Sequence, residues 1–161
     1  MHKYQIAFRF VFSIIICQLA GLIGSIFTTP NISTWYATLT RPYLSPPNFV
    51  FGPVWTLLFI LMGISLFRIW QKQIDSKDSL QSKEILLSLK IFFFQLLLNI
   101  FWSILFFGFR SPGFALIEII ALWISILLTI FAFSKIDRVA AFLLLPYILW
   151  VTFATYLNYM I

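Results

Sequence analysis

The sequence has little charge, one cysteine and one histidine. Only 10% of its 161 residues are charged, whereas roughly a quarter of an ordinary soluble chain is charged. Hydrophobic residues make up 61% of the chain, and its mean hydropathy is +0.99. A soluble domain of this size cannot bury so much apolar surface, so the composition excludes one and predicts an all-α integral membrane protein.

The scarcity of cysteine and histidine limits the chemistry. Cys17 lies alone in an apolar run and has no partner for an intramolecular disulfide, and His2 is beside the amino terminus. No histidine, cysteine or carboxylate residues have the spacing of a metal site or of a haem ligand. We therefore predict no metal and no built-in cofactor. The basic residues behind the net charge of +6 are scattered at the ends of apolar segments, which indicates membrane orientation rather than nucleic-acid binding.

Five apolar segments are each long enough to span a bilayer, which takes about 20 helical residues. The sequence predicts a five-transmembrane-helix bundle in one domain over residues 1–161, with spans at about 10–27, 54–70, 85–107, 114–133 and 140–161. The alternative of a cleaved signal peptide at the first span is disfavoured, because the run is too long and lacks an A-x-A-like exit. The hydrophilic residues 71–84 are interpreted as a loop or a helix extension.

The basic residues are shared unequally between the two ends of this bundle. With Lys90 left out as part of the third span, eight lie at the amino terminus or around the second and fourth loops, whereas Arg41 and Arg110 are the two at the opposite end. Since cytoplasmic loops carry the excess of basic residues, we expect a cytoplasmic amino terminus. The carboxy terminus and the first loop are then expected outside a bacterial cell membrane.

The first loop, residues 28–50, is rich in proline and aromatic side chains. Pro42, Pro46 and Pro47 fix φ and force the residues before them into extended geometry, so residues 38–48 cannot form a regular helix. Pro53 is compatible with the first turn of the following helix. We interpret this segment as a stiff lid that forms one wall of a ligand site.

Polar residues within the spans are informative because an unpaired polar group is costly in hydrocarbon. Gln95, Asn99 and Ser103 form one stripe on the third span, with Trp102 beside it. The stripe is explained equally by hydrogen bonds between helices and by Asn99 meeting a polar edge of a ligand in a cavity. Both explanations can hold at once.

Glu118 enters the fourth span without a second acid or base nearby, which is a poor signal for hydrolysis. We expect it to pair with Arg110 or to cap a neighbouring loop. On the fifth span, Pro146 is expected to bend the helix. Trp150, Ala154 and Asn158 then share one face, a pattern typical of close packing and also of a cavity wall.

Spaced motifs after the first span resemble the TspO/MBR family, which comprises tryptophan-rich sensory proteins and the translocator protein, or peripheral benzodiazepine receptor. The motifs that carry the resemblance are Trp35-Tyr36, Leu39, Arg41-Pro42, Pro46-Pro47, Phe51-Gly52-Pro53-Val54-Trp55, Gln95-Leu96, Leu98-Asn99, Trp102, Phe106-Phe107-Gly108, Arg110, Ala115-Leu116, Glu118, Leu144, Pro146-Tyr147, Trp150, Phe153-Ala154-Thr155 and Leu157-Asn158.

The resemblance implies a five-helix bundle, commonly a homodimer, with a pocket beneath the first loop. It implies porphyrin ligands such as protoporphyrin IX, isoquinoline and benzodiazepine drugs, and cholesterol in animal members. The implied ligand-binding residues are Trp35, Tyr36, Pro46, Trp55, Phe59, Asn99, Trp102, Trp150 and Ala154. Some bacterial members are proposed to degrade porphyrin in light and oxygen, with tryptophans that match Trp55 and Trp150 as the catalytic residues.

Three positions depart from the family pattern. Leu44 replaces a tryptophan between the prolines, Phe59 replaces a tyrosine, and no basic residue follows Tyr159. The last departure removes the basic residue of a proposed sterol motif, so we do not predict sterol binding. We predict a membrane receptor or sensor that prefers metal-free porphyrin to haem. The first alternative is a porphyrin-degrading enzyme. The second is a tetrapyrrole or lipid transporter, which ranks last because five spans cannot form an even inverted pair.

Overall fold

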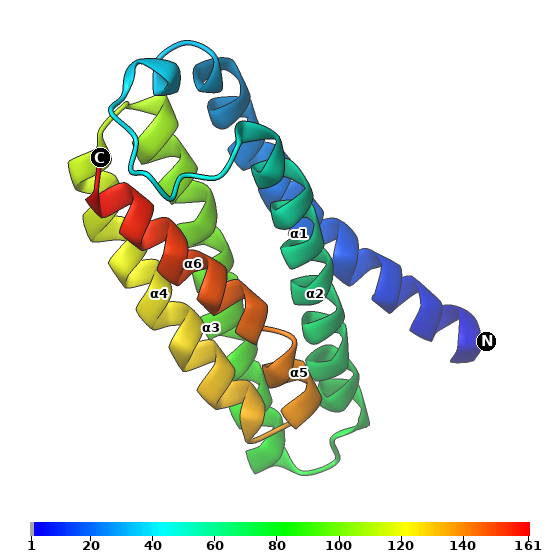
Figure 1. The fold of residues 1–161 in the computed structure, drawn as a ribbon. Coiled ribbons are helices and arrows are strands. Elements are labelled where there is room, and N and C mark those ends of the chain that lie inside the picture. The colour runs from blue at the N-terminus through cyan, green and yellow to red at the C-terminus, as the bar shows by residue number, and fades with distance from the viewer. Residues whose placement is uncertain (1) are drawn as a thin grey trace.

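Long helices lie side by side in the computed structural model, which describes residues 2–161 (Figure 1). The helices are α1 (His2–Ile32), α2 (Asn48–Asp75), α3 (Ser79–Ser103), α4 (Pro112–Ser134), α5 (Arg138–Phe142) and α6 (Leu145–Tyr159), with the short turns η1 (Tyr36–Thr38) and η2 (Ile104–Gly108). Among the described residues, five helical segments are long and apolar enough to cross a membrane, α3 with η2 and α5 with α6 each counting as one. The predicted all-α five-helix membrane bundle is confirmed.

The helices extend beyond the predicted spans at several ends. Helix α1 continues to Ile32, so the first loop is shorter than predicted and covers residues 33–47, named loop 1 below. Most of the hydrophilic stretch 71–84 is helical, with residues 76–78 as the connection between α2 and α3. The Asp78 carboxylate caps α3 by accepting a hydrogen bond from the Leu80 amide at 3.1 Å. Polar residues thus extend and cap these helices instead of forming a long loop.

The fifth span is broken rather than bent. Helix α5 ends at Phe142, α6 begins at Leu145, and Pro146 lies in the first turn of α6, where its missing N–H breaks no helical hydrogen bond. The Asp137 carboxylate caps α5 by accepting hydrogen bonds from the Val139 and Ala140 amides. Its position is fixed by an ion pair to Arg68 of α2 at 2.8 Å. The expected kink at Pro146 is therefore a helix start.

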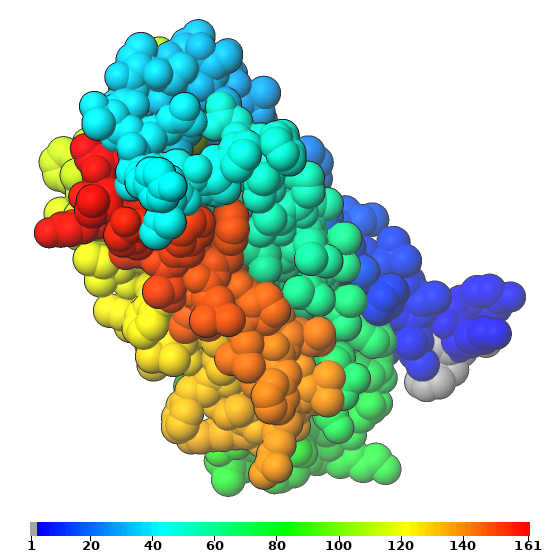
Figure 2. Space-filling view, in the orientation of Figure 1, coloured from blue at the N-terminus to red at the C-terminus, as the bar shows by residue number. Residues whose placement is uncertain are grey.

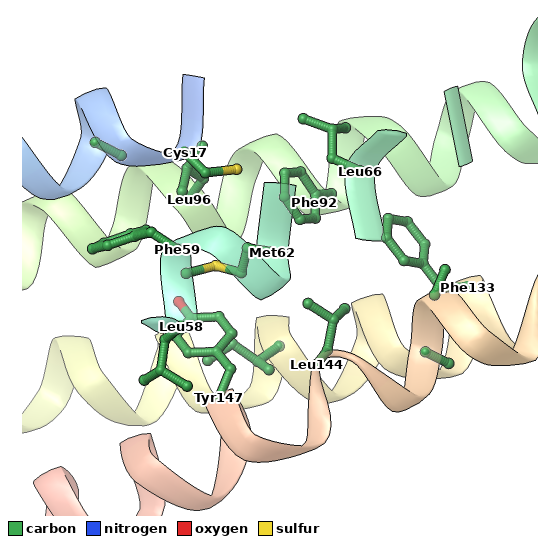
Figure 3. Close-up of a cluster of buried hydrophobic side chains, with 14 of the residues drawn as sticks. Cys17, Leu58, Phe59, Met62, Leu66, Phe92, Leu96, Phe133, Leu144 and Tyr147 are labelled. Atoms are coloured by element: carbon green, nitrogen blue, oxygen red, sulfur yellow. The ribbon is translucent and has the colours of Figure 1, made fainter. Parts of the chain in front are cut away.

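The main hydrophobic core extends from Ile69 and Ile85, near the α2–α3 connection, to Ala20 and Phe59 at the cavity. Figure 3 shows side chains from several helices meeting there, among them Met62, Phe92, Phe133 and Tyr147. The rings of Phe92 and Phe133 are stacked at 5.7 Å. Helices α1 and α2 touch at Gly63, where a Cβ atom would lie 2.5 Å from the Ile14 Cα. Toward loop 1 the helices separate and enclose a cavity.

Candidate functional site

Loop 1 crosses the end of the bundle and covers it (Figures 1 and 2). After the short turn η1, residues 39–47 contain no helix, which confirms the prediction made from the prolines except at its two ends, where Thr38 belongs to η1 and Asn48 begins α2. Tyr36 is 6% exposed and packs against the rings of Phe106 and Phe107 in η2, at 6.2 and 5.8 Å. These aromatic contacts hold the start of loop 1 against the end of α3.

Arg41 fastens the second half of loop 1. Its guanidinium lies 5.5 Å from the centre of the Tyr36 ring, a cation–π distance. Its Nη1 donates a hydrogen bond to Asn48 Oδ1, at the start of α2, at 3.2 Å. Burial raises the pKa of the Tyr36 hydroxyl, and the nearby positive charge of Arg41 opposes part of the shift. Loop 1 is therefore anchored both to η2 and to α2.

A cavity of about 290 Å³ lies beneath loop 1, between α1, α2, the α3–η2 end and α6. Its surface is largely apolar, as in most small-molecule sites. Of the nine residues predicted to bind ligand, the seven that line this cavity are Tyr36, Trp55, Phe59, Asn99, Trp102, Trp150 and Ala154. The structure thus brings together residues from loop 1 and three helices that are far apart in the sequence.

Trp35 and Pro46, the other two predicted residues, are not among those that line the cavity. The Trp35 ring meets Phe106 edge-on at 5.5 Å and Phe107 at 6.4 Å. Trp35 therefore supports η2 from behind, and Pro46 belongs to the extended part of loop 1. A ligand contact by either residue stays a prediction.

Eight of the residues that line the cavity are aromatic. The Trp55 ring stacks on Phe59 at 5.6 Å, and Trp102 stacks on Phe106 at 5.0 Å. Trp150 meets Phe51 edge-on at 6.0 Å. The Trp150 indole N–H is buried and has no hydrogen-bond partner among the described residues. Such rings give large contact areas and fixed geometry to an apolar, planar ligand.

Asn99 connects the cavity to a buried polar network. Its Nδ2 donates to the Tyr147 hydroxyl at 2.9 Å, and that hydroxyl donates to Gln95 Oε1 at 2.8 Å. The network joins α3 to α6 behind the cavity, and Tyr147 is fully buried. Hydrogen bonds between helices, the first explanation of the polar stripe, are therefore present. Asn99 also lines the cavity, so its amide remains close enough to meet a ligand.

Asn158 plays a similar part nearer loop 1. Its Oδ1 accepts a hydrogen bond from the Trp102 indole N–H at 3.1 Å, and its Nδ2 donates to the Pro112 carbonyl at 2.9 Å. Trp150, Ala154 and Asn158 all line the cavity, so their common face on α6 is a cavity wall. The Trp102 ring is held in place by this hydrogen bond as well as by stacking.

Helix α1 forms a cavity wall that the sequence analysis missed. Small and hydroxyl-bearing residues between positions 20 and 29 line it, and at Gly21 a Cβ atom would lie 2.6 Å from the Phe59 ring. Gln18 Nε2 also donates to the Thr56 carbonyl of α2 at 3.0 Å. The available signal was the recurrence of alanine, glycine, serine and threonine every three to four residues. Ala20 and Gly24, four residues apart on α1, belong to this pattern and line the cavity.

The expected ion pair between Glu118 and Arg110 is wrong. Arg110 has a φ of 53° in the turn before α4, and its side chain donates to Asn31 Oδ1 at 3.2 and 3.3 Å. Both carboxylate oxygens of Glu118 are buried and have no hydrogen-bond partner among the described residues. With its backbone in the left-handed region, Arg110 directs its side chain to Asn31 at the end of α1 and not to Glu118.

Comparison with known proteins agrees with this architecture. The family model described as TspO/MBR family matches residues 13–161. The chain belongs to the TspO/MBR family. Among its TspO/MBR relatives, the tryptophan-rich protein TspO of Chlorobaculum tepidum is 41% identical over 150 residues, covering 91% of this chain and 89% of the relative. The match begins within α1, so the family resemblance includes most of the first span and not only the motifs that follow it.

Two further TspO/MBR relatives carry different names. The translocator protein of Bos taurus is 35% identical over 142 residues, which cover 88% of this chain and 81% of the relative. The tryptophan-rich sensory protein of Cereibacter sphaeroides is 32% identical over 125 residues, which cover 78% and 73%. Together with the five spans, family membership identifies an integral membrane protein.

Proposed function

We propose that this chain is a membrane receptor or sensor that binds a porphyrin-type tetrapyrrole, or an isoquinoline- or benzodiazepine-like drug, in the cavity beneath loop 1. The observation that carries the proposal is the cavity wall, in which Trp55, Trp102 and Trp150 surround an apolar space with Asn99 at one side. A flat, mostly apolar ring complements such a wall. The name of the Cereibacter sphaeroides relative, a sensory protein, supports a sensing role.

The size of the cavity constrains how a tetrapyrrole would bind. Its volume of about 290 Å³ is just below the range of about 300–1,000 Å³ for ligand pockets. We therefore expect the ring to lie between the tryptophans and its side groups to extend under loop 1. Each well-placed aromatic contact adds about 0.5–1.5 kcal/mol beyond burial. Asn99, already fixed by Tyr147, would orient a polar edge.

Metal-free porphyrin is the preferred ligand in this proposal. Neither histidine nor cysteine is among the described residues that line the cavity, and Cys17 is buried in the core. A haem iron would then find no histidine or cysteine as an axial ligand. Of the usual ligand types only the Tyr36 phenol lines the cavity among the described residues, and burial raises its pKa, which disfavours the phenolate that binds iron. The test is a comparison of protoporphyrin IX with haemin, both titrated in the dark. Equal affinities with a haemin spectrum typical of axial ligation would contradict the preference.

The experiment for the receptor proposal is quenching of tryptophan fluorescence by protoporphyrin IX in the dark. Saturable quenching is expected for the wild type, with weaker binding for Asn99→Ala. Loss of one net hydrogen bond of about 0.5–1.5 kcal/mol corresponds to a roughly 2- to 12-fold rise in Kd. Quenching that never saturates, and that is equal in both proteins, would mean that the pigment only partitions into detergent.

A second candidate is light-dependent degradation of porphyrin, favoured by the position of Trp55 and Trp150 on the same cavity wall. The pigment would supply the photochemistry, and the two indoles would act as electron donors. Trp55→Phe and Trp150→Phe should then stop the loss of pigment in light and leave dark binding largely unchanged. Pigment loss at the rate of free porphyrin in all three proteins would exclude enzymatic degradation.

A further inference from the structure

A second hollow lies on the side of the bundle between α1, α2 and α3. Its volume is about 240 Å³, and it is lined by Phe12, Ile16, Leu66, Trp70, Leu89 and Phe93. We name it the side groove. It shares no lining residue with the cavity beneath loop 1. Figure 2 shows the amino-terminal part of α1 projecting from the bundle.

The side groove is almost purely apolar. Phe12 and Phe93 remain 41% and 43% exposed, and the ring of Phe12 meets Trp70 at 6.0 Å across the groove. In a membrane-spanning bundle such a hollow faces hydrocarbon. Lipid chains fill it at no polar cost, because its lining offers hardly any group that needs a hydrogen bond. A hydrocarbon chain is therefore the ligand that its walls fit.

Two cationic side chains border the side groove. Arg9 is on the same face of α1 as Phe12 and Ile16, at the helical spacing i, i+3 and i+7. Its Nη1 donates to Gln71 Oε1 at 3.0 Å, directly after Trp70 of the opposite wall. Lys90 directly follows Leu89 of the third wall and is exposed. Neither cation forms an ion pair within residues 3–161.

Lys90 lies well inside α3 rather than at its end. It lies 11 residues after the start of α3 at Ser79, about 16 Å of helix rise, and is the only charged residue of the predicted span 85–107. A lysine at this depth extends its stem along the helix and places its ammonium at the headgroup level. Trp70 has the amphipathic ring typical of the same level. Both cations are thus placed where a phosphate would lie above a buried acyl chain.

We propose that the side groove binds one acyl chain of an anionic phospholipid whose phosphate is held by Arg9 and Lys90. Charge complementarity identifies the headgroup, because two cations without an acidic partner border the groove. The apolar lining identifies the chain. The bound lipid would connect α1 to α2 and α3 where their helices diverge. The proposal is independent of the ligand in the cavity beneath loop 1.

The test uses the full chain in mixed micelles and native mass spectrometry, with phosphatidylglycerol and phosphatidylcholine of identical acyl chains. A basic residue near the surface strengthens binding to anionic lipid by about fivefold. The wild type should therefore retain phosphatidylglycerol about 25-fold better than phosphatidylcholine. Arg9→Gln with Lys90→Gln should abolish this preference. Lys83→Gln, the same charge change on an exposed residue of the same helix, should leave most of it.

A second variant tests the chain rather than the headgroup. Leu89→Trp fills the side groove and should remove the tightly held lipid of either kind, with helicity unchanged by circular dichroism. Equal retention of both lipids by the wild type would overturn the proposal, as would an equal loss in Lys83→Gln and in the double variant. A dimer that Leu89→Trp dissociates would instead identify a second copy of the chain as the occupant.

Discussion

Tyr147→Phe tests the polar network behind the cavity. The Tyr147 hydroxyl accepts from Asn99 Nδ2 at 2.9 Å and donates to Gln95 Oε1 at 2.8 Å, and the residue is fully buried. Removing the hydroxyl leaves an amide N–H and an amide oxygen unpaired in the bundle. Hydrogen bonds between membrane helices average about 0.6 kcal/mol and reach about 1.7, so losing two should lower the free energy of unfolding by about 1–3 kcal/mol.

The assay is reversible unfolding in mixed micelles with increasing sodium dodecyl sulfate, followed by circular dichroism. Tyr156→Phe is the matched control, because Tyr156 is on the same helix, is 39% exposed and forms no side-chain hydrogen bond within residues 3–161. We expect that control to change the free energy of unfolding by less than about 0.5 kcal/mol, as exposed substitutions do. Equal, small effects of the two substitutions would refute the argument that this network stabilises the bundle.

Three further predictions follow from the geometry. Gly63→Val should separate α1 from α2, because the first added carbon would lie 2.5 Å from the Ile14 Cα; we expect a loss of at least about 2 kcal/mol by the same assay. The Arg68 hydrogen bond and the backbone amides at the start of α5 outweigh burial and hold the pKa of Asp137 below its usual value. The stability that Asp137 contributes is therefore present above the unfolded-state pKa and lost as pH falls through the lower folded-state pKa. The free energies of unfolding of the wild type and of Asp137→Asn should therefore converge as the pH is lowered. Haemin should bind more weakly than protoporphyrin IX in dark titrations, and a tighter haemin complex would contradict the cavity chemistry.

The sequence predicts the number and type of the spans because hydrocarbon thickness fixes their length. It predicts the non-helical part of loop 1 because Pro42, Pro46 and Pro47 fix the backbone. Helix ends were less predictable, since polar residues such as Gln71 and Lys72 extend α2 into water instead of ending it. The break between α5 and α6 was visible at Pro146 only as a bend, because the sequence does not show which turn the proline occupies.

The cavity was only partly predictable. Spacing places Trp150 and Ala154 on one face of α6. The spacing of small residues on α1 fits a cavity wall, but it fits close helix packing equally well and so does not show that α1 closes the opposite side. The π-helical turn η2, which brings Phe106 and Phe107 under loop 1, has no clear sequence signal. The partner of Arg110 was mispredicted because side-chain direction depends on its φ of 53°, which a sequence does not show for a residue other than glycine.

The most direct test of the account is a pair of dark titrations with protoporphyrin IX, comparing Ala154→Leu with Ala121→Leu. Ala154 lines the cavity, whereas Ala121 is exposed on α4. Overpacking by about 1–3 kcal/mol predicts a roughly 5- to 150-fold weaker Kd for Ala154→Leu and wild-type binding for Ala121→Leu. Unchanged, saturable binding in Ala154→Leu would place the ligand elsewhere and contradict the proposed site.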